Sequence, residues 1–231
     1  MHSVRMVTRK IQGSPVNVTG VDPYDVEYES HLEECFLDLV RFDHRVDDFC
    51  RWEEEIVWYD DNKKRRTYTP DFIIRYKKVD GKTVLKTEVI EVKPDFDEDD
   101  PRPVARLPRK DKENTRENEL KWQAAGRLCK SRGLRFLVKR ESEICTPYLN
   151  NARFLTAYLE RIRDDSRSDA ILAALEPGVR IPMGDLVARL GKNPGERLDY
   201  RPLVYQLIAT RRLEVDLTQV LQDSSLIGLP R

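Results

Sequence analysis

Two acidic residues and a lysine stand at a spacing that could hold a divalent cation against a phosphate ester. Asp71 lies in one apolar run, and Glu91 and Lys93 lie in a second run further along the chain. Both runs are rich in Val, Ile, Tyr and Phe, and the segment Val79–Lys82 between them contains an Asp-Gly pair, so we expect two neighbouring strands joined by a hairpin turn. Because side chains alternate along a strand, Glu91 and Lys93 share a face.

Carboxylates held close together repel one another unless a positive charge lies between them, and a hard cation such as Mg2+ prefers oxygen ligands. Such a cation polarises a phosphodiester and lowers the pKa of a bound water, while Lys93 could orient that water or stabilise charge on the phosphate. The alternative is a solvated strand face, because 35% of the chain is charged against about 25% in average proteins. The apolar neighbours of both acids argue against it, since an unpaired buried acid is costly.

The helices and strands expected around these residues, taken in their order along the chain, predict an α/β core with a mixed sheet. Ser30 and Glu33 form a capping-box pattern at the start of a helix that carries apolar residues at helical spacing. A second helix is expected over 113–132, with Gly133 ending it. The expected strands are Val46–Phe49, Glu55–Tyr59, Tyr68–Ile74, Glu88–Lys93 and Leu134–Lys139.

Residues 147–231 read as a second, mainly helical domain, after a first domain over 1–146 that begins with an irregular N-terminal arm. A helical face starts at Thr146-Pro147, and the polar run Arg163–Asp169 follows it. Three short helices and a closing strand predict a winged-helix-like module, with a helical protein-docking domain as the alternative. Their expected ranges are Ile171 to about Pro177, Met183–Leu190, Tyr200–Arg212 and the strand Leu213–Leu217, with a turn over Gly191–Gly195.

Basic residues gather in two blocks, although the 41 basic and 41 acidic residues give a formal charge of zero. Blocks beside an acidic cation site would draw a polyanion such as DNA toward it. A solvated turn is the plainer reading of each block by itself. The first block is Lys63, Lys64, Arg65 and Arg66, and the second is Arg102, Arg106, Arg109, Lys110 and Lys112.

Several other classes of protein receive no support from the chain. No run has the length to cross a membrane or the apolar core of a signal peptide, so a cytoplasmic protein without membrane contact is expected. Gly-rich phosphate loops and Gly-x-Ser-x-Gly elbows are missing, and the three histidines do not cluster. We expect buried, reduced thiols at Cys35, Cys50, Cys129 and Cys145, because their spacing fits neither a zinc site nor a disulfide framework.

Four ordered blocks resemble the TnsA family, the endonuclease subunit of heteromeric, Tn7-like bacterial transposases. The blocks are Ser30–Glu33, Phe42-Asp43, Tyr68–Phe72 and Glu91–Pro94. Leu120–Trp122, Gly133–Phe136 and Thr146–Asn151 are also similar to that family, and the likeness runs from about Tyr28 to Ile162. The resemblance implies a restriction-endonuclease-like PD-(D/E)XK core, a mixed sheet flanked by helices, followed by a small winged-helix-like domain.

The resemblance also implies an active centre of Glu33, Asp71, Glu91 and Lys93. Asp71 and Glu91 would be the main ligands of Mg2+, for which Mn2+ could substitute. The backbone carbonyl of Val92 would be a further ligand, and Glu33 would act through a water. A helix cap is the alternative explanation of Glu33, but the match to the family's Ser-x-Leu-Glu pattern favours the functional role. Some family members carry Gln where this chain has Glu91.

The resemblance further implies a Mg2+-dependent DNA endonuclease that hydrolyses the phosphodiester at the 5′ ends of a transposon. Its partners would be the transposon-end DNA, a DDE-type, TnsB-like transposase and an AAA+, TnsC-like ATPase regulator. The basic blocks, with Arg106, Arg109 and Lys110 in the second, would grip backbone phosphates. Two alternatives stay open, a stand-alone restriction or repair nuclease of the same fold and a catalytically silent adaptor between transposase and regulator.

Overall fold

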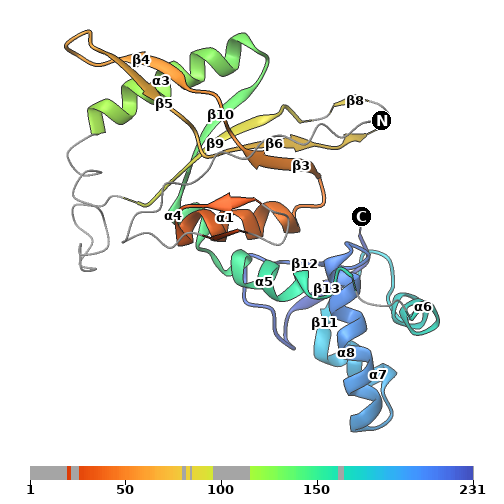
Figure 1. Ribbon diagram of the computed structural model, residues 1–231. Coiled ribbons are helices and arrows are strands. Elements are labelled where there is room, and N and C mark those ends of the chain that lie inside the picture. The colour runs from red at the N-terminus through yellow and green to blue at the C-terminus, as the bar shows by residue number, and fades with distance from the viewer. Residues whose placement is uncertain are drawn as a thin grey trace, which may run out of the picture. The chain divides into compact units, whose positions relative to one another are not determined.

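The chain folds into two compact units whose boundary lies between Ile144 and Cys145. A computed structural model describes residues 20–21, 26–79, 82–83, 85–95, 115–160 and 164–230 (Figure 1). The domain boundary predicted from the sequence, after residue 146, lies two residues further along. Each unit is described below by itself.

A four-stranded sheet forms the centre of the first unit. Its order is β10-β9-β6-β3. β9 and β10 run parallel, whereas β6 is antiparallel to both β9 and β3, so the predicted mixed sheet is confirmed. Parallel neighbours need a long crossover, which here includes helix α3 (Thr115–Ser131). The strands are β3 (Val46–Arg51), β6 (Phe72–Tyr76), β9 (Glu88–Lys93) and β10 (Arg135–Arg140).

The segment Tyr68–Ile74 is not the single strand that its composition predicts. Its first residue ends β5 (Arg65–Tyr68), which pairs with β4 (Ile56–Tyr59) in a separate two-stranded hairpin. The chain then breaks at Pro70, which has no N–H to donate to a ladder and restricts the residue before it. As a result Asp71 lies in a bend directly before β6.

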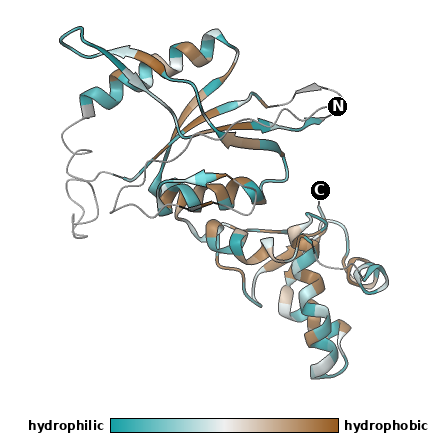
Figure 2. Cartoon of the chain, viewed as in Figure 1, coloured by the Kyte–Doolittle hydropathy of each residue, from teal (hydrophilic) through white to brown (hydrophobic). Residues whose placement is uncertain are grey.

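Two helices cover opposite faces of the central sheet. Helix α1 (His31–Phe42) stacks Phe36 on Phe72, with ring centroids 5.9 Å apart, and Phe72 pairs in register with Ile90 of β9. Helix α3 places Cys129 against Val89, the neighbour of Ile90. Because consecutive residues of a strand point to opposite faces, α1 and α3 lie on different sides of β9 (Figure 1). Figure 2 shows hydrophobic residues along the sheet and on α1.

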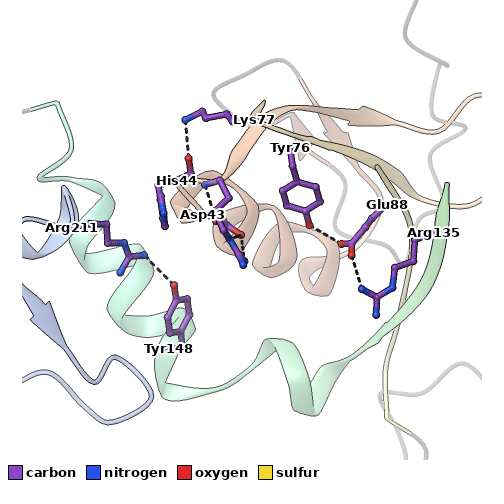
Figure 3. A network of polar contacts seen from close by, with 9 residues as sticks. Asp43, His44, Tyr76, Lys77, Glu88, Arg135, Tyr148 and Arg211 are labelled. Carbon is purple, nitrogen blue, oxygen red and sulfur yellow. Dashed lines mark hydrogen bonds and ion pairs between the residues drawn. The ribbon is translucent and has the colours of Figure 1, made fainter. Parts of the chain in front are cut away.

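A polar network occupies the α1 face of the sheet at the start of β9 (Figure 3). Glu88 accepts a 2.7 Å hydrogen bond from the Tyr76 hydroxyl and lies 3.4 Å from the Arg135 guanidinium. Burial and the neighbouring Glu88 carboxylate raise the pKa of Tyr76. Glu88 and Glu91 are three positions apart on β9, so their side chains point to opposite faces of the sheet. The network of Tyr76, Glu88 and Arg135 is therefore separate from the predicted site around Glu91.

Short elements complete the first unit. β1 (Gly20–Val21) pairs with β2 (Glu27–Tyr28), and β7 (Lys78–Val79) pairs with β8 (Lys82–Thr83) around the predicted Asp-Gly turn, whose two residues lie outside the described part. Helix α4 (Glu141–Ile144) follows β10 and closes the unit.

The second unit combines helices with a small antiparallel sheet of order β11-β13-β12. Two predicted helix starts are wrong. α6 begins inside the polar run, because the Asp164 side chain caps the Arg167 N–H, and α8 begins in the predicted turn, because Asn193 caps Glu196 and Pro194 suits a first helical position. The elements are α5 (Pro147–Thr156), α6 (Asp165–Ala173), β11 (Ile181–Pro182), α7 (Met183–Leu190), α8 (Pro194–Ala209), β12 (Glu214–Val215) and β13 (Leu226–Gly228).

A buried amide ties the C-terminal segment of this unit to α5. The Asn151 side chain donates to the carbonyls of Leu217 and Gln219, each at 2.7 Å, and accepts from the Leu221 N–H at 3.2 Å. Three of its four hydrogen-bonding positions are thereby satisfied in a buried setting.

The cysteines and the helices bear on two further sequence predictions. Cys35 and Cys129 are buried free thiols as expected, but Cys50 is only half-buried and Cys145 is exposed, directly after α4.

Helices in the described ranges are all too short or too polar to cross a membrane.

Candidate functional site

Glu91 is a buried carboxylate surrounded by hydrogen-bond donors from three elements. Its side chain is 2% exposed. Oε2 accepts a 2.6 Å hydrogen bond from the hydroxyl of Tyr68 at the end of β5. Oε1 lies 3.1 Å from Nζ of Lys93 and 3.6 Å from Nζ of Lys121 on α3. The predicted common face of Glu91 and Lys93 is therefore present, and it is the face that α3 covers.

Asp71 is fixed against the same strand by its backbone and by its side chain. Its N–H donates to the Ile90 carbonyl, and its own carbonyl accepts from the Trp52 N–H. The Val92 N–H donates to Oδ2 at 2.7 Å, which sets the orientation of the carboxylate. Asp71 thus extends the hydrogen-bond ladder of β6 toward both neighbouring strands, and its carboxylate is held at Val92, the residue after Glu91.

The Asp71 carboxylate has a pKa raised well above its ordinary value. Burial is the largest cause, followed by the negative charges of Glu91 and Glu33, while Lys93 and the Val92 N–H act in the opposite direction. Desolvation and like charges both disfavour an ionised acid. Burial and the two neighbouring acids therefore disfavour the ionised form of Asp71, whereas a bound cation would favour it.

Glu33 acts as a helix cap and is also part of a buried ion pair. It forms the capping box with Ser30, whose side chain accepts from the Glu33 N–H. Its Oε2 lies 2.9 Å from Nη1 of Arg51 on β3, and the guanidinium of Arg51 lies 5.4 Å above the ring of Phe72. The cap is thus present, Arg51 balances the charge of Glu33, and a catalytic role for Glu33 stays a prediction.

Of the four predicted active-centre residues, Lys93 pairs with Glu91, and the charges of Glu91 and Glu33 both act on Asp71. Glu33 comes from α1, on the other face of β9 from the Glu91–Lys93 pair, and its own ion pair is with Arg51. Sequence reasoning assigned no role to three further residues, Tyr68, Lys121 and Arg51. A signal existed for Lys121, which falls four residues before the buried Ala125 and so lies on the apolar stripe of its helix, where a lysine needs a partner.

The basic residues predicted to bind DNA divide into two groups. Lys63 and Lys64 follow the Asp61-Asn62 turn of the β4–β5 hairpin, and Arg65 and Arg66 begin β5, all four with exposed side chains. Arg66 pairs with Asp60 at 3.1 Å. The other predicted contacts, Arg106, Arg109 and Lys110, with Arg102 and Lys112, lie outside the described residues.

The donor set suits a hard divalent cation. Among the described residues no group of three or more His, Cys, Asp and Glu side chains could hold a metal ion. Mg2+ does not need such a group, since it is usually bound through one or two carboxylates and keeps several waters. Asp71 and Glu91 supply two carboxylates on adjoining segments, and a bound cation would favour the ionised form of Asp71, which burial and the neighbouring acids disfavour.

Residues 43–141 match the family model described as TnsA-like endonuclease N terminal, so the first unit carries a TnsA-like endonuclease domain. The matched region contains Asp71, Glu91 and Lys93, together with all four strands of the central sheet. A search of curated proteins found no match to the chain.

The TnsA-like domain carries a coarse functional assignment with it. It supports a nuclease of Tn7-like transposition with a restriction-endonuclease-like fold. It also implies DNA and Tn7-like transposase proteins as general partners.

Proposed function

We propose that this TnsA-like protein is a Mg2+-dependent endonuclease that hydrolyses the phosphodiester at the 5′ ends of a transposon during cut-and-paste transposition. In this proposal it works in complex with a DDE-type transposase and an AAA+ ATPase regulator. The observation that carries the proposal is the pairing of Asp71 and Glu91 on adjoining segments of the matched domain, with Lys93 3.1 Å from the second carboxylate.

The residues of the site divide the work in a simple way. Asp71 and Glu91 would hold Mg2+, with the Val92 carbonyl as a further ligand; Mn2+ is a chemically similar substitute. The bound ion would supply a Lewis acid and a more acidic water. Val92 keeps the Asp71 carboxylate oriented through its N–H. Lys93 orients the attacking water or stabilises the negative charge that grows on the phosphate.

Glu33 belongs to the edge of this site. Arg51 and the capping box hold its carboxylate at a fixed place on α1. From there Glu33 would act on the cation through a water. Arg51 is then a positioning residue that keeps the carboxylate from adding its full charge to that of Asp71.

The second unit is proposed to be a winged-helix-like domain that contacts the partner proteins. Its elements follow the order helix α6, strand β11, helices α7 and α8, and strands β12 and β13, with the three strands in one antiparallel sheet. That order supports a winged-helix arrangement over a purely helical docking domain. Along the chain, α6 precedes the first strand of the sheet, and α7 and α8 lie between its first and second strands.

The proposal is tested by strand cutting at transposon ends in a mixture with the transposase partner. Replacing Asp71 by Ala should abolish 5′-end cutting, a loss of at least 100-fold on the order of what metal-site and charge-stabilising residues supply. The control is Asp47→Ala, which removes an exposed acid of β3. Assembly with the partner should survive both changes. Retained cutting by the Asp71 variant would remove the proposal.

A further inference from the structure

Lys121 is placed at the active centre without a role in the chemistry described so far. Its ammonium lies 3.6 Å from Oε1 of Glu91, the same oxygen that Lys93 approaches to 3.1 Å. One carboxylate oxygen therefore faces two cations from two elements, strand β9 and helix α3. A single ammonium is enough to balance one carboxylate, so the second one needs a further explanation.

The position of Lys121 is held by aromatic side chains. Its Nζ lies 4.8 Å from the ring centre of Tyr68 and 5.8 Å from that of Trp122. Tyr68 is also the residue whose hydroxyl binds the other oxygen of Glu91. The Lys121 side chain is only 18% exposed. A long, flexible side chain confined in this way is preorganised, which reduces the entropy lost when it binds an anion.

A third cation lies at the same end of the sheet. Arg140 is the last residue of β10 and pairs in register with Lys93, the last residue of β9. Its guanidinium lies 5.2 Å from the ring of Trp122, and Nη1 donates to the Pro94 carbonyl at 3.2 Å. Lys93, Lys121 and Arg140 thus come together where the two parallel strands end, on the face covered by α3.

The charge balance of the site indicates what these cations are for. Asp71 and Glu91 carry two negative charges when ionised, and Lys93, Lys121 and Arg140 carry three positive ones. A divalent cation bound to the carboxylates would leave an excess of three positive charges. The cation and the ammonium of Lys121 would also repel each other across Glu91, which weakens that ion pair. A phosphodiester is the anion that the proposed reaction supplies to take its place.

We infer that Lys121 is a second lysine of the nuclease site, which donates to a non-bridging oxygen of the phosphodiester at or next to the cut. The inference rests on the proposed function. The competing explanation is that Lys121 is only a structural counter-charge for Glu91, in which case it does not touch DNA.

The two explanations are separated by measuring DNA affinity instead of cutting. The full chain, with the transposase partner present to fix its register on the DNA, is titrated with transposon-end duplexes in Ca2+, each duplex carrying one neutral methylphosphonate linkage at a different position. The variants are Lys121→Met, Lys121→Gln as a shorter polar replacement, and Lys121→Arg, which keeps the charge. Lys130→Met is the matched control, since it removes an exposed lysine of the same helix. Thermal melting shows which variants are folded.

A direct contact predicts a specific pattern. The unchanged chain should lose about tenfold in affinity when the contacted linkage is neutral, as expected for a charge-assisted hydrogen bond. Lys121→Met and Lys121→Gln should lose about tenfold on the unmodified duplex and show no further loss at that linkage, whereas Lys121→Arg should restore the sensitivity. Lys130→Met should match the unchanged chain.

Two different results would overturn two different claims. If both neutral Lys121 variants show the same position-dependent losses as the unchanged chain, Lys121 does not contact phosphate and the inference is wrong. If instead the unchanged chain is insensitive to a neutral linkage at every position, no phosphate is held at the site and the proposed function itself fails.

Discussion

Asp71 is placed where its charge is unfavourable for the fold, as is common for residues at functional sites. Burial and the charges of Glu91 and Glu33 raise its pKa, so the ionised carboxylate destabilises the folded chain while no cation is bound. Residues at functional sites commonly lower the stability of the fold in this way, and neutral replacements at such positions often stabilise the protein.

Asp71→Asn should therefore raise the free energy of unfolding in the absence of divalent ions, by about 0.5–2 kcal/mol near neutral pH. The sign follows from the raised pKa. Protonated Asp71 supports the fold fully below the ordinary pKa of an aspartate, and that contribution is lost as the pH rises through the higher folded-state pKa. The gain from Asn should vanish in acid and grow with pH, as urea unfolding at several pH values will show.

The control for this measurement is Asp47→Asn, which neutralises an exposed acid of β3. It should leave the pH profile nearly unchanged. A gain for Asp71→Asn that is constant across the whole pH range would show that its origin is packing and not charge.

Elements differ in how far their sequences determine them. The strand β9 and the helix α7 have the bounds expected from their composition, because their apolar patterns are local. The prediction for Tyr68–Ile74 was wrong because a proline break within an apolar run turns one expected strand into the ends of two. The predicted starts of α6 and α8 were wrong because the capping side chains of Asp164 and Asn193 lie in stretches that look like loops.

The β4–β5 hairpin is the described element best suited to contact the DNA backbone, because the four residues after its turn, from Lys63 to Arg66, are basic and exposed. We expect the double change Lys64→Gln and Arg65→Gln to weaken DNA binding and to lower the slope of log affinity against log salt by about 1–2, because each side chain would neutralise one phosphate. Lys63 is left unchanged because its φ of 57° is strained for most residues.

The matched control is the double change Arg127→Gln and Lys130→Gln, which removes the same charge from the exposed surface of α3. Salt titrations of both variants give the comparison. Equal slopes for the two would mean that only the net charge of the chain matters, and the hairpin would lose its assignment as a DNA-binding element.

At the scale of the whole molecule, the candidate site is assembled from segments far apart in the sequence. Asp71, Glu91 and Lys93 could be predicted because strand alternation and an acid-x-lysine spacing are local signals. Tyr68, Lys121 and Arg51 were not assigned roles, because only the packing of β5, α3 and β3 brings them to the carboxylates. Local sequence patterns thus point to the proposed ligands but not to the residues that contact them from other elements.

The candidate nuclease site lies in the first unit, whereas the contacts with partner proteins are proposed for the second. All residues of the candidate site lie before the boundary at Ile144, within or close to the region that matches the TnsA-like model. A formal net charge of zero fits a chain that borrows DNA specificity from its partners, since its own basic residues would bind only phosphates.

The most direct test of the account is calorimetric titration of the full chain with Mg2+ and with Mn2+, without DNA or partner proteins. The account predicts cation binding that is lost in both Asp71→Asn and Glu91→Gln and kept in Asp47→Asn. Affinity should rise with pH, because the cation competes with the proton on Asp71. Absence of binding by the unchanged chain, or equal affinity in all three variants, would contradict the claim that these two carboxylates hold the catalytic metal.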